Sequence, residues 1–160
     1  MVALEKGVPV ALDRAGIEGL LPHRDPMLLL DRVLWLEPGE RVTAVASDLA
    51  ARAPGVQRAT GEAIPRELLI EGIAQAAAAL LVAEGVAEGR YPAGEPQPGV
   101  LAAVPEFRFH APVPEGAPVV FRVAVVRRLG RLVLLSGEAT AGAVLVGEGT
   151  VSIALGKPGG

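Results

Sequence analysis

Two polar side chains interrupt an otherwise apolar stretch of the sequence, and their types suit acid–base chemistry. Glu71 and Gln75 lie four residues apart within residues 66–86 (RELLIEGIAQAAAALLVAEGV), where Ile70 and Ala74 are among the neighbours of Glu71. Side chains four residues apart share one face of a helix. Apolar surroundings favour the protonated form of a carboxyl group, the form that donates a proton as a general acid. The alternative interpretation is a water-exposed glutamate that the helix dipole stabilises.

Histidine, the commonest general base, occurs only twice. His23 and His110 are far apart in the sequence and lack the spacing of metal ligands. The chain contains no cysteine, which excludes disulfide bonds and thiolate ligands. We therefore expect no metal and no other cofactor. His110 is expected at the end of a strand, and His23 is expected to order the loop before the first strand.

Three stretches, in this order, resemble the 3-hydroxyacyl-acyl carrier protein (ACP) dehydratase family, the FabZ-like proteins. They are residues 21–33 (LPHRDPMLLLDRV), 69–76 (LIEGIAQA) and 107–116 (FRFHAPVPEG), and the similarity runs from about Gly16 to Leu155. The resemblance implies an α+β hot-dog fold, in which an antiparallel β-sheet wraps around one long central α-helix. It also implies at least a dimer, with an acyl chain in a tunnel beside the central helix.

For the chemistry, the resemblance implies dehydration of a 3-hydroxyacyl thioester. In the family, a histidine and a carboxylate from opposite subunits remove the C2 proton and the C3 hydroxyl. A backbone N–H at the helix start polarises the thioester carbonyl. Glu71 matches the family carboxylate and is the expected general acid, with Gln75 beside it. The residues expected to contact the substrate are His23, Arg66, Ile70 and Ala74.

The sequence departs from the family pattern at two positions. The family histidine lies in a Gly-His-Phe-Pro stretch, and counting back from Glu71 without a gap places Gln57 of residues 55–58 (GVQR) at that position. A glutamine can donate and accept hydrogen bonds but cannot take up a proton near neutral pH. The glycine that follows the helix-start proline in the family is Arg66 here. Its backbone N–H is retained, and its cationic side chain would alter access or bind an anionic group.

Three functions therefore stay open. The first is a divergent 3-hydroxyacyl-ACP or -CoA dehydratase with Glu71 as the acid and Gln57 at the position of the base. The second is an acyl-CoA or acyl-ACP thioesterase of the same fold that uses Glu71 and needs no histidine. The third is a non-catalytic acyl-binding subunit paired with an active dehydratase, as in the aryl polyene-type branch that the opening motif resembles.

The remaining pattern predicts the elements that must position these residues in a single domain spanning residues 1–160, with its core at about 16–155. Proline and glycine separate runs of apolar or alternating residues. Helices are expected at residues 12–21 and 66–86, and strands at 27–36, 41–49, 100–110, 118–128, 132–141 and 143–155.

Composition narrows the range of partners. The net charge is −3, and no cluster of lysine and arginine is interleaved with aromatic residues, so nucleic acid is not an expected partner. No uninterrupted apolar run is long enough to predict a membrane span, and we expect a cytoplasmic protein without a secretory signal. The expected partners are acyl-ACP or acyl-CoA and further protein chains. Those chains form a homodimer, a higher oligomer of dimers, or a heterodimer with an active homologue.

Overall fold

The computed structural model describes residues 2–52 and 64–156 of the chain. In this part of the chain, seven antiparallel strands form one sheet in the order β1-β2-β3-β5-β6-β7-β4. The elements are β1 (Val10–Leu12), α1 (Arg14–Glu18), β2 (Arg32–Glu37), β3 (Arg41–Ala46), the 3-10 turn η1 (Ala50–Arg52), α2 (Glu67–Ala87), β4 (Gly99–Phe109), β5 (Val119–Leu129), β6 (Leu132–Ala141) and β7 (Val144–Leu155).

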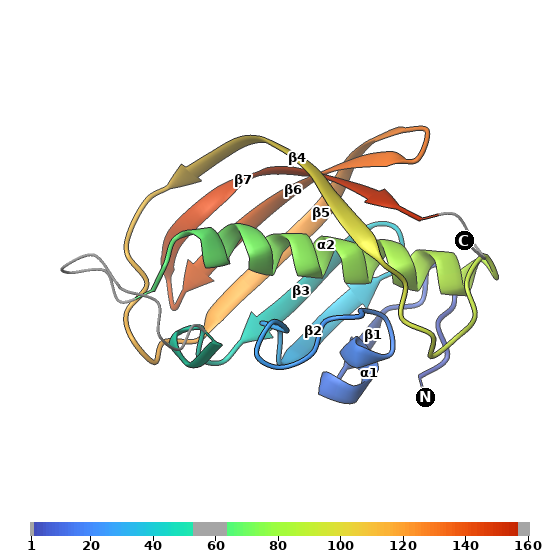
Figure 1. Cartoon of the computed structure of the whole chain (residues 1–160), viewed down its shortest axis with the longest axis horizontal. Coiled ribbons are helices and arrows are strands. Elements are labelled where there is room, and N and C mark those ends of the chain that lie inside the picture. Colours follow the sequence, from blue (N-terminus) through green and yellow to red (C-terminus); the bar gives the residue numbers. More distant parts are fainter. Residues whose placement is uncertain (1, 53–63, 157–160) are drawn as a thin grey trace.

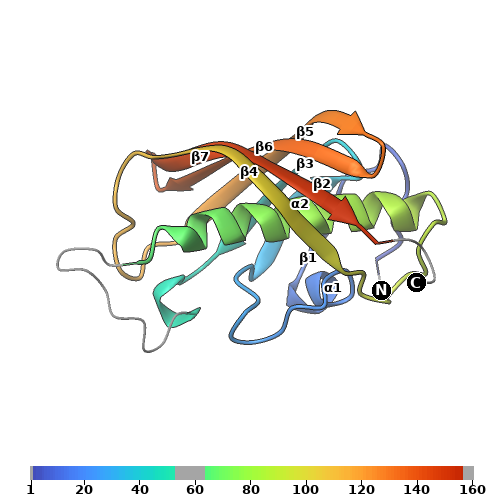
Figure 2. The same ribbon diagram turned by 45° about the horizontal axis from the view of Figure 1, so that its top comes forward.

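The sheet curves around α2, which lies along its inner face (Figures 1 and 2). Alternate residues of the central strands point inward, and Phe121, Leu135 and Val151 are fully buried there. The expected hot-dog architecture is therefore confirmed.

Helix α2 is buried on nearly all sides because its middle consists mainly of alanine. A helix with such short side chains lets the sheet approach closely, and glycines on both elements reduce the distance further. A Cβ atom at Gly72 would lie 2.2 Å from the ring of Phe121, and one at Gly137 would lie 2.4 Å from Ile73. By length and composition α2 is apolar enough to cross a membrane, but its apolar residues are buried against the sheet.

Residues 27–31 differ from the prediction, because the strand expected at 27–36 begins only at Arg32. Leu28, Leu29 and Leu30 are buried as their apolar character predicts. Side chains from elsewhere in the molecule form many of the hydrogen bonds that the backbone N–H and carbonyl groups of this segment would otherwise make with a neighbouring strand. Arg14 donates to the carbonyls of Leu28 and Leu30 at 3.3 and 3.2 Å, and Leu29 N–H donates to a side chain of α2. A high proportion of apolar residues in the sequence does not by itself distinguish a buried loop from a strand.

The N-terminal region also differs from the prediction. The helix expected at residues 12–21 spans only Arg14–Glu18, because Asp13 caps its start by accepting a hydrogen bond from Gly16 N–H at 2.9 Å. Leu12 belongs instead to β1, a strand that the sequence did not predict and that pairs with β2.

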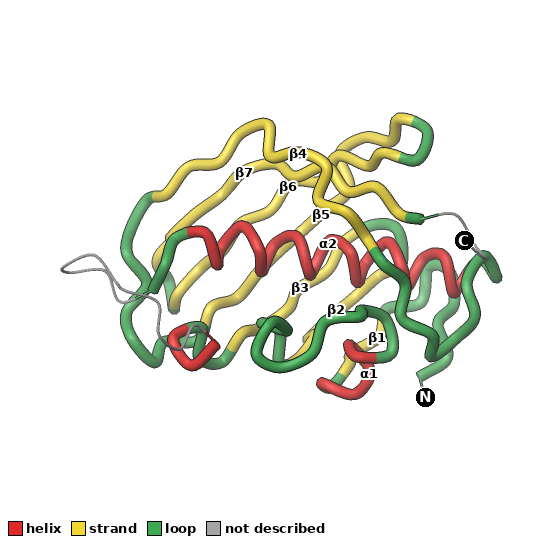
Figure 3. The backbone as a smooth tube through the Cα atoms, in the orientation of Figure 1, coloured by secondary structure: helices red, strands yellow, loops and turns green. Residues whose placement is uncertain are grey.

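Strand β4 is an edge strand with an unusual surface. It pairs with β7 on one side only and crosses over α2 (Figure 3). Val100, Leu101, Val104 and Phe109 are exposed on it. Pro105, which lacks a backbone N–H, lies where the pairing with β7 is irregular, as is usual for proline in an edge strand. A long apolar edge of this kind is available for pairing with another strand.

Candidate active site at Glu71, Gln75 and His23

Gln75 connects the central helix to the opening motif. Its side chain is 1% exposed. Its Oε1 accepts a hydrogen bond from Leu29 N–H at 2.9 Å, while Nε2 donates to the carbonyl of Met27 and to Oε1 of Glu71, both at 2.8 Å. The amide thus uses both of its donor hydrogens and its acceptor, and it fixes the Glu71 carboxyl relative to residues 27–29.

Glu71 lies one helical turn before Gln75, and its side chain is 35% exposed in the single chain. Gln75 and His23 both approach its Oε1 atom. Among residues 2–52 and 64–156, Oε2 has no hydrogen-bond partner. Oε1 thus accepts from Gln75, and Oε2 is left for contact with another group.

The imidazole ring of His23 lies beside the carboxyl group of Glu71. Its Nε2 atom lies 3.6 Å from Oε1 of Glu71, and its side chain is 29% exposed. The Nδ1 atom is buried and has no hydrogen-bond partner in the described part of the chain. We expected His23 to order its loop, but the described contacts assign that task mainly to other side chains. Arg24, for example, donates to the carbonyls of Leu21 and Glu18.

A network of two arginines and two aspartates holds the loop of His23 in place. Arg14 and Arg52 both bind Asp25 and Asp31, and Oδ2 of Asp31 accepts from Ser47 N–H at 2.7 Å. Burial by itself would raise the pKa of Asp31. The Ser47 hydrogen bond and the Arg52 charge outweigh burial and lower that pKa below its ordinary value. Asp31 is therefore a charged anchor for the loop.

The other predicted site residues lie at or near the start of α2. Arg66 occupies the helix N-cap position, is exposed, and has its guanidinium carbon 5.7 Å from the centre of the Phe109 ring. Ile70 is half-buried and Ala74 is 7% exposed. Gln57, expected at the position of the family histidine, lies outside the described residues.

His110 is not part of this cluster. It lies just after β4, as expected, and its Nε2 atom is 3.0 Å from Glu148 on the outer face of the sheet. No group of three potential metal ligands occurs in residues 2–52 and 64–156.

The proximity of His23 to Glu71 is the feature of the site that sequence reasoning missed. The two residues are 48 positions apart. The sequence contained one signal for this contact: His23 and Glu71 both lie in stretches that resemble the family, and Gln75 lies in the same stretch as Glu71.

The sequence is similar to those of known dehydratases. The sequence matches the family model described as ApeP-like, the ApeP dehydratase, over residues 15–154. A 3-hydroxyacyl-[acyl-carrier-protein] dehydratase FabZ from Symbiobacterium thermophilum is 35% identical over 138 residues, which cover 85% of this chain and 92% of that protein.

Solved structures of similar fold include dehydratases and thioesterases. The dehydratase heterocomplex ApeI:P from Xenorhabdus doucetiae matches with a TM-score of 0.74 at 17% identity, over 89% of this chain and 91% of that one. A mutant of the fluoroacetyl-CoA-specific thioesterase FlK matches with a TM-score of 0.55 at 17% identity, over 76% and 89%. At these identities the structural matches establish the fold.

Proposed function

The chain belongs to the ApeP-like dehydratase family, and from that premise we propose that it dehydrates 3-hydroxyacyl thioesters carried on ACP or CoA. The observation that carries the proposal is the Glu71 carboxyl group, which Gln75 holds at 2.8 Å and the His23 imidazole faces at 3.6 Å. Removal of water from such a thioester needs a base for the C2 proton and an acid for the C3 hydroxyl. The cluster contains both types of group.

In the proposed reaction, Glu71 is the general acid. The base takes the C2 proton, the C2–H electron pair forms the C2–C3 double bond, and the C3–O bond breaks. Oε2 of Glu71 donates its proton to the departing hydroxyl, which leaves as water. Gln75 acts as a positioning residue, because its hydrogen bond to Oε1 leaves Oε2 to carry the proton.

We propose His23 as the base in this chain. A neutral imidazole takes a proton near neutral pH, which Gln57 cannot do. His23 Nε2 lies 3.6 Å from Oε1 of Glu71, so both groups can reach one substrate. After product release, exchange with solvent resets them: His23 loses the proton it took up, and Oε2 of Glu71 regains one. This proposal supplies the proton acceptor that the sequence alone did not identify.

The acyl tunnel requires a second chain in this account. Glu71 is 35% exposed on a single chain, so a dry channel beside it must be closed by a partner. The exposed apolar residues and unpaired edge of β4 support strand pairing between two chains across this edge. We propose a homodimer formed in this way, with Arg66, Ile70 and Ala74 near the entering thioester.

The test offers purified protein 3-hydroxybutyryl and 3-hydroxydecanoyl thioesters of both CoA and ACP and follows enoyl product by mass spectrometry. We expect enoyl thioester from the wild type, and Glu71→Gln should lower kcat by about 10²–10⁴-fold. The matched control is Glu67→Gln, one helical turn earlier and exposed, which should keep wild-type activity. Release of free thiol without enoyl product would instead identify a thioesterase, and no turnover would refute an active enzyme.

The second candidate is a subunit that works with an active homologue. What favours it is the ApeP-like family match together with the structural match to ApeI:P, a dehydratase heterocomplex. Co-expression with a dehydratase from the same organism that has the Gly-His-Phe-Pro histidine distinguishes a paired subunit from an enzyme active on its own. Activity only in the mixed complex supports the paired subunit, whereas an active homodimer contradicts it.

A further inference from the structure

The middle of α2 has one face that the rest of the described chain does not cover completely. Between residues 73 and 83, Ala74 and Ala78 are 7% and 6% exposed, whereas every other residue there is at most 1% exposed. The two alanines follow Glu71 at spacings that place all three residues on one face of the helix. A narrow accessible strip, formed by Glu71, Ala74 and Ala78, therefore runs along α2 from the candidate active site.

Strand β4 ends this strip where it crosses over α2, as both ribbon views show (Figures 1 and 2). The crossing lies at the first residue of the strand. A Cβ atom at Gly99 would lie 3.5 Å from Cβ of Ala78, which is van der Waals contact. Past the crossing, Leu81 and Val82 are buried. The strip therefore closes about 10 Å along the helix axis from Glu71.

The two walls of the strip also meet near this point. One wall is residues 21–31, the segment that Gln75 holds beside α2 through its hydrogen bonds to Met27 and Leu29. The other wall is β4 with the loop that precedes it. Gln97 N–H in that loop donates to the carbonyl of Leu20 at 3.0 Å and so ties the walls together. The strip is open at Glu71 and closed at Ala78.

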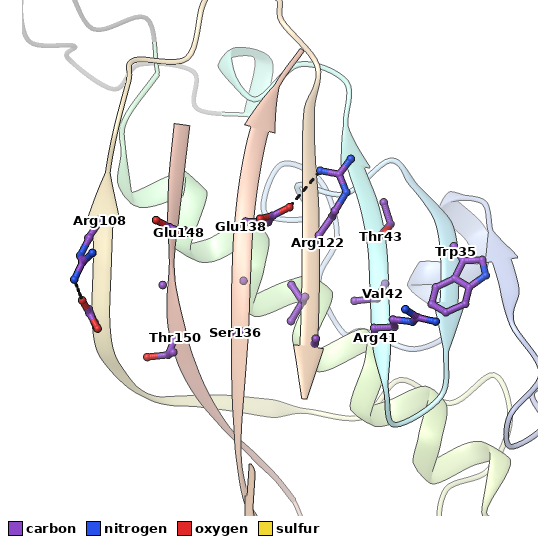
Figure 4. Close-up of a pocket in the computed structure, with 15 residues that line it drawn as sticks. Trp35, Arg41, Val42, Thr43, Arg108, Arg122, Ser136, Glu138, Glu148 and Thr150 are labelled. Carbon is purple, nitrogen blue, oxygen red and sulfur yellow. Dashed lines mark hydrogen bonds and ion pairs between the residues drawn. The ribbon is translucent and has the colours of Figure 1, made fainter. Parts of the chain in front are cut away.

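Two hollows in the described part of the chain lie outside this strip. One, of about 880 Å³, is on the outer face of the sheet, and Figure 4 shows its lining side chains with α2 behind the strands. The other, of about 430 Å³, is lined by residues of α1 and by Val86, two helical turns past Ala78. An acyl tail that extends along α2 from Glu71 therefore meets β4 before it reaches either hollow.

We propose that the crossing of Gly99 over Ala78 limits the length of the acyl chain that the protein accepts. This inference rests on the proposed function, which places the 3-hydroxyl group of the substrate at Glu71. An extended chain advances by roughly 1.3 Å per carbon, so about 10 Å holds a tail of about eight carbons beyond C3. The preferred substrates are therefore medium-chain 3-hydroxyacyl thioesters of about eleven carbons at most.

The test measures binding of saturated acyl-CoAs, from butyryl-CoA to palmitoyl-CoA, by isothermal titration calorimetry below their micelle concentrations. These probes carry no 3-hydroxyl group, so their binding does not depend on turnover. Affinity should rise about four-fold for each added carbon as far as decanoyl- or dodecanoyl-CoA and should not rise further. The kcat/KM values of the matching 3-hydroxyacyl-CoAs should follow the same profile.

The two readouts separate this inference from the proposed function. A binding limit near dodecanoyl-CoA without enoyl production would refute dehydration and support the length limit. Affinity that keeps rising to palmitoyl-CoA would overturn the length limit whatever the turnover, as would the absence of binding by every acyl-CoA.

Substitutions on the strip should move the limit in opposite directions. Ala74→Val narrows the strip one helical turn nearer to Glu71 and should shift the limit to about hexanoyl-CoA. Ala78→Gly removes the methyl group that meets β4 and should improve binding of longer chains, a gain that misfolding cannot produce. The matched control Ala87→Val lies past the crossing, at the last residue of α2, and should leave the limit unchanged. An unaltered limit in both strip variants would contradict the proposal.

Discussion

Gln75 bonds to three groups through one amide: Leu29 N–H, the Met27 carbonyl and the Glu71 carboxyl. Periodicity in the sequence was sufficient to place Gln75 and Glu71 on one helix face. It could not place His23 beside them, because that contact depends on the path of residues 22–31, which side chains distant in the sequence determine. The local pattern therefore indicated the proposed acid, Glu71, and its neighbour Gln75, but not the proposed base.

Gln75→Leu should lower both stability and activity. Leucine fills a similar volume but leaves the buried Leu29 N–H and Met27 carbonyl without partners, at about 1–3 kcal/mol for each group. It also frees Glu71, so kcat should fall more than KM rises. Chemical denaturation and steady-state kinetics measure the two effects. The control Gln97→Leu removes only a hydrogen bond to the Glu95 carbonyl at 3.1 Å and should have little effect on either.

Asp31→Asn tests the charged anchor of the His23 loop. Because the folded state lowers the pKa of Asp31, its charge stabilises the fold above the unfolded pKa of about 4, and this contribution is lost as pH falls through the lowered folded value. The stability difference between wild type and Asp31→Asn should thus be largest near neutral pH and shrink below about pH 4. Urea denaturation from pH 7 to 3 measures it. A pH-independent difference would contradict the account.

At the scale of elements, the sequence predicted the long helix and the four C-terminal strands to within two residues at each end. Their periodicity and the intervening prolines and glycines are local signals. Two predictions near the N-terminus, the strand at 27–36 and the helix at 12–21, were wrong in their bounds for a common reason. Residues 27–31 and Leu12 are apolar and buried, but tertiary hydrogen bonds decide whether such a segment is a strand, a loop or part of a helix.

Gly72→Ala should destabilise the contact between α2 and the sheet. A Cβ atom would lie 2.2 Å from the Phe121 ring, and overpacking of this kind costs about 1–3 kcal/mol, which outweighs the roughly 1 kcal/mol that alanine gains over glycine in a helix. Calorimetry should show a lower melting temperature. Combining it with Phe121→Leu should cost less than the sum of the single changes, and Gly156→Ala, with its nearest contact at 3.9 Å, should be nearly neutral.

At the scale of the whole molecule, the free surfaces of one chain determine its assembly. The apolar edge of β4 is proposed to pair with a second chain and so to close the site beside Glu71. Loss of pairing at this edge should therefore remove activity.

Leu101→Lys combined with Val104→Lys tests the β4 edge. Two lysines on an edge strand oppose pairing with another strand, so the molar mass should fall by half and enoyl production should fall with it. Val144→Lys, an exposed valine at the start of β7, is the matched control and should change neither. A doubly substituted protein of unaltered mass and activity would show that the active assembly does not use this edge.

The most direct test of the central claim is a double-mutant cycle on turnover of a 3-hydroxyacyl thioester by Glu71→Gln, His23→Gln and the double variant. Groups that act as one catalytic unit are strongly non-additive. We therefore expect each single change to lower kcat by about 10²–10⁴-fold, with the double variant no slower than the slower single one. Wild-type turnover by His23→Gln, or two losses that simply multiply, would contradict an acid–base pair formed by these residues.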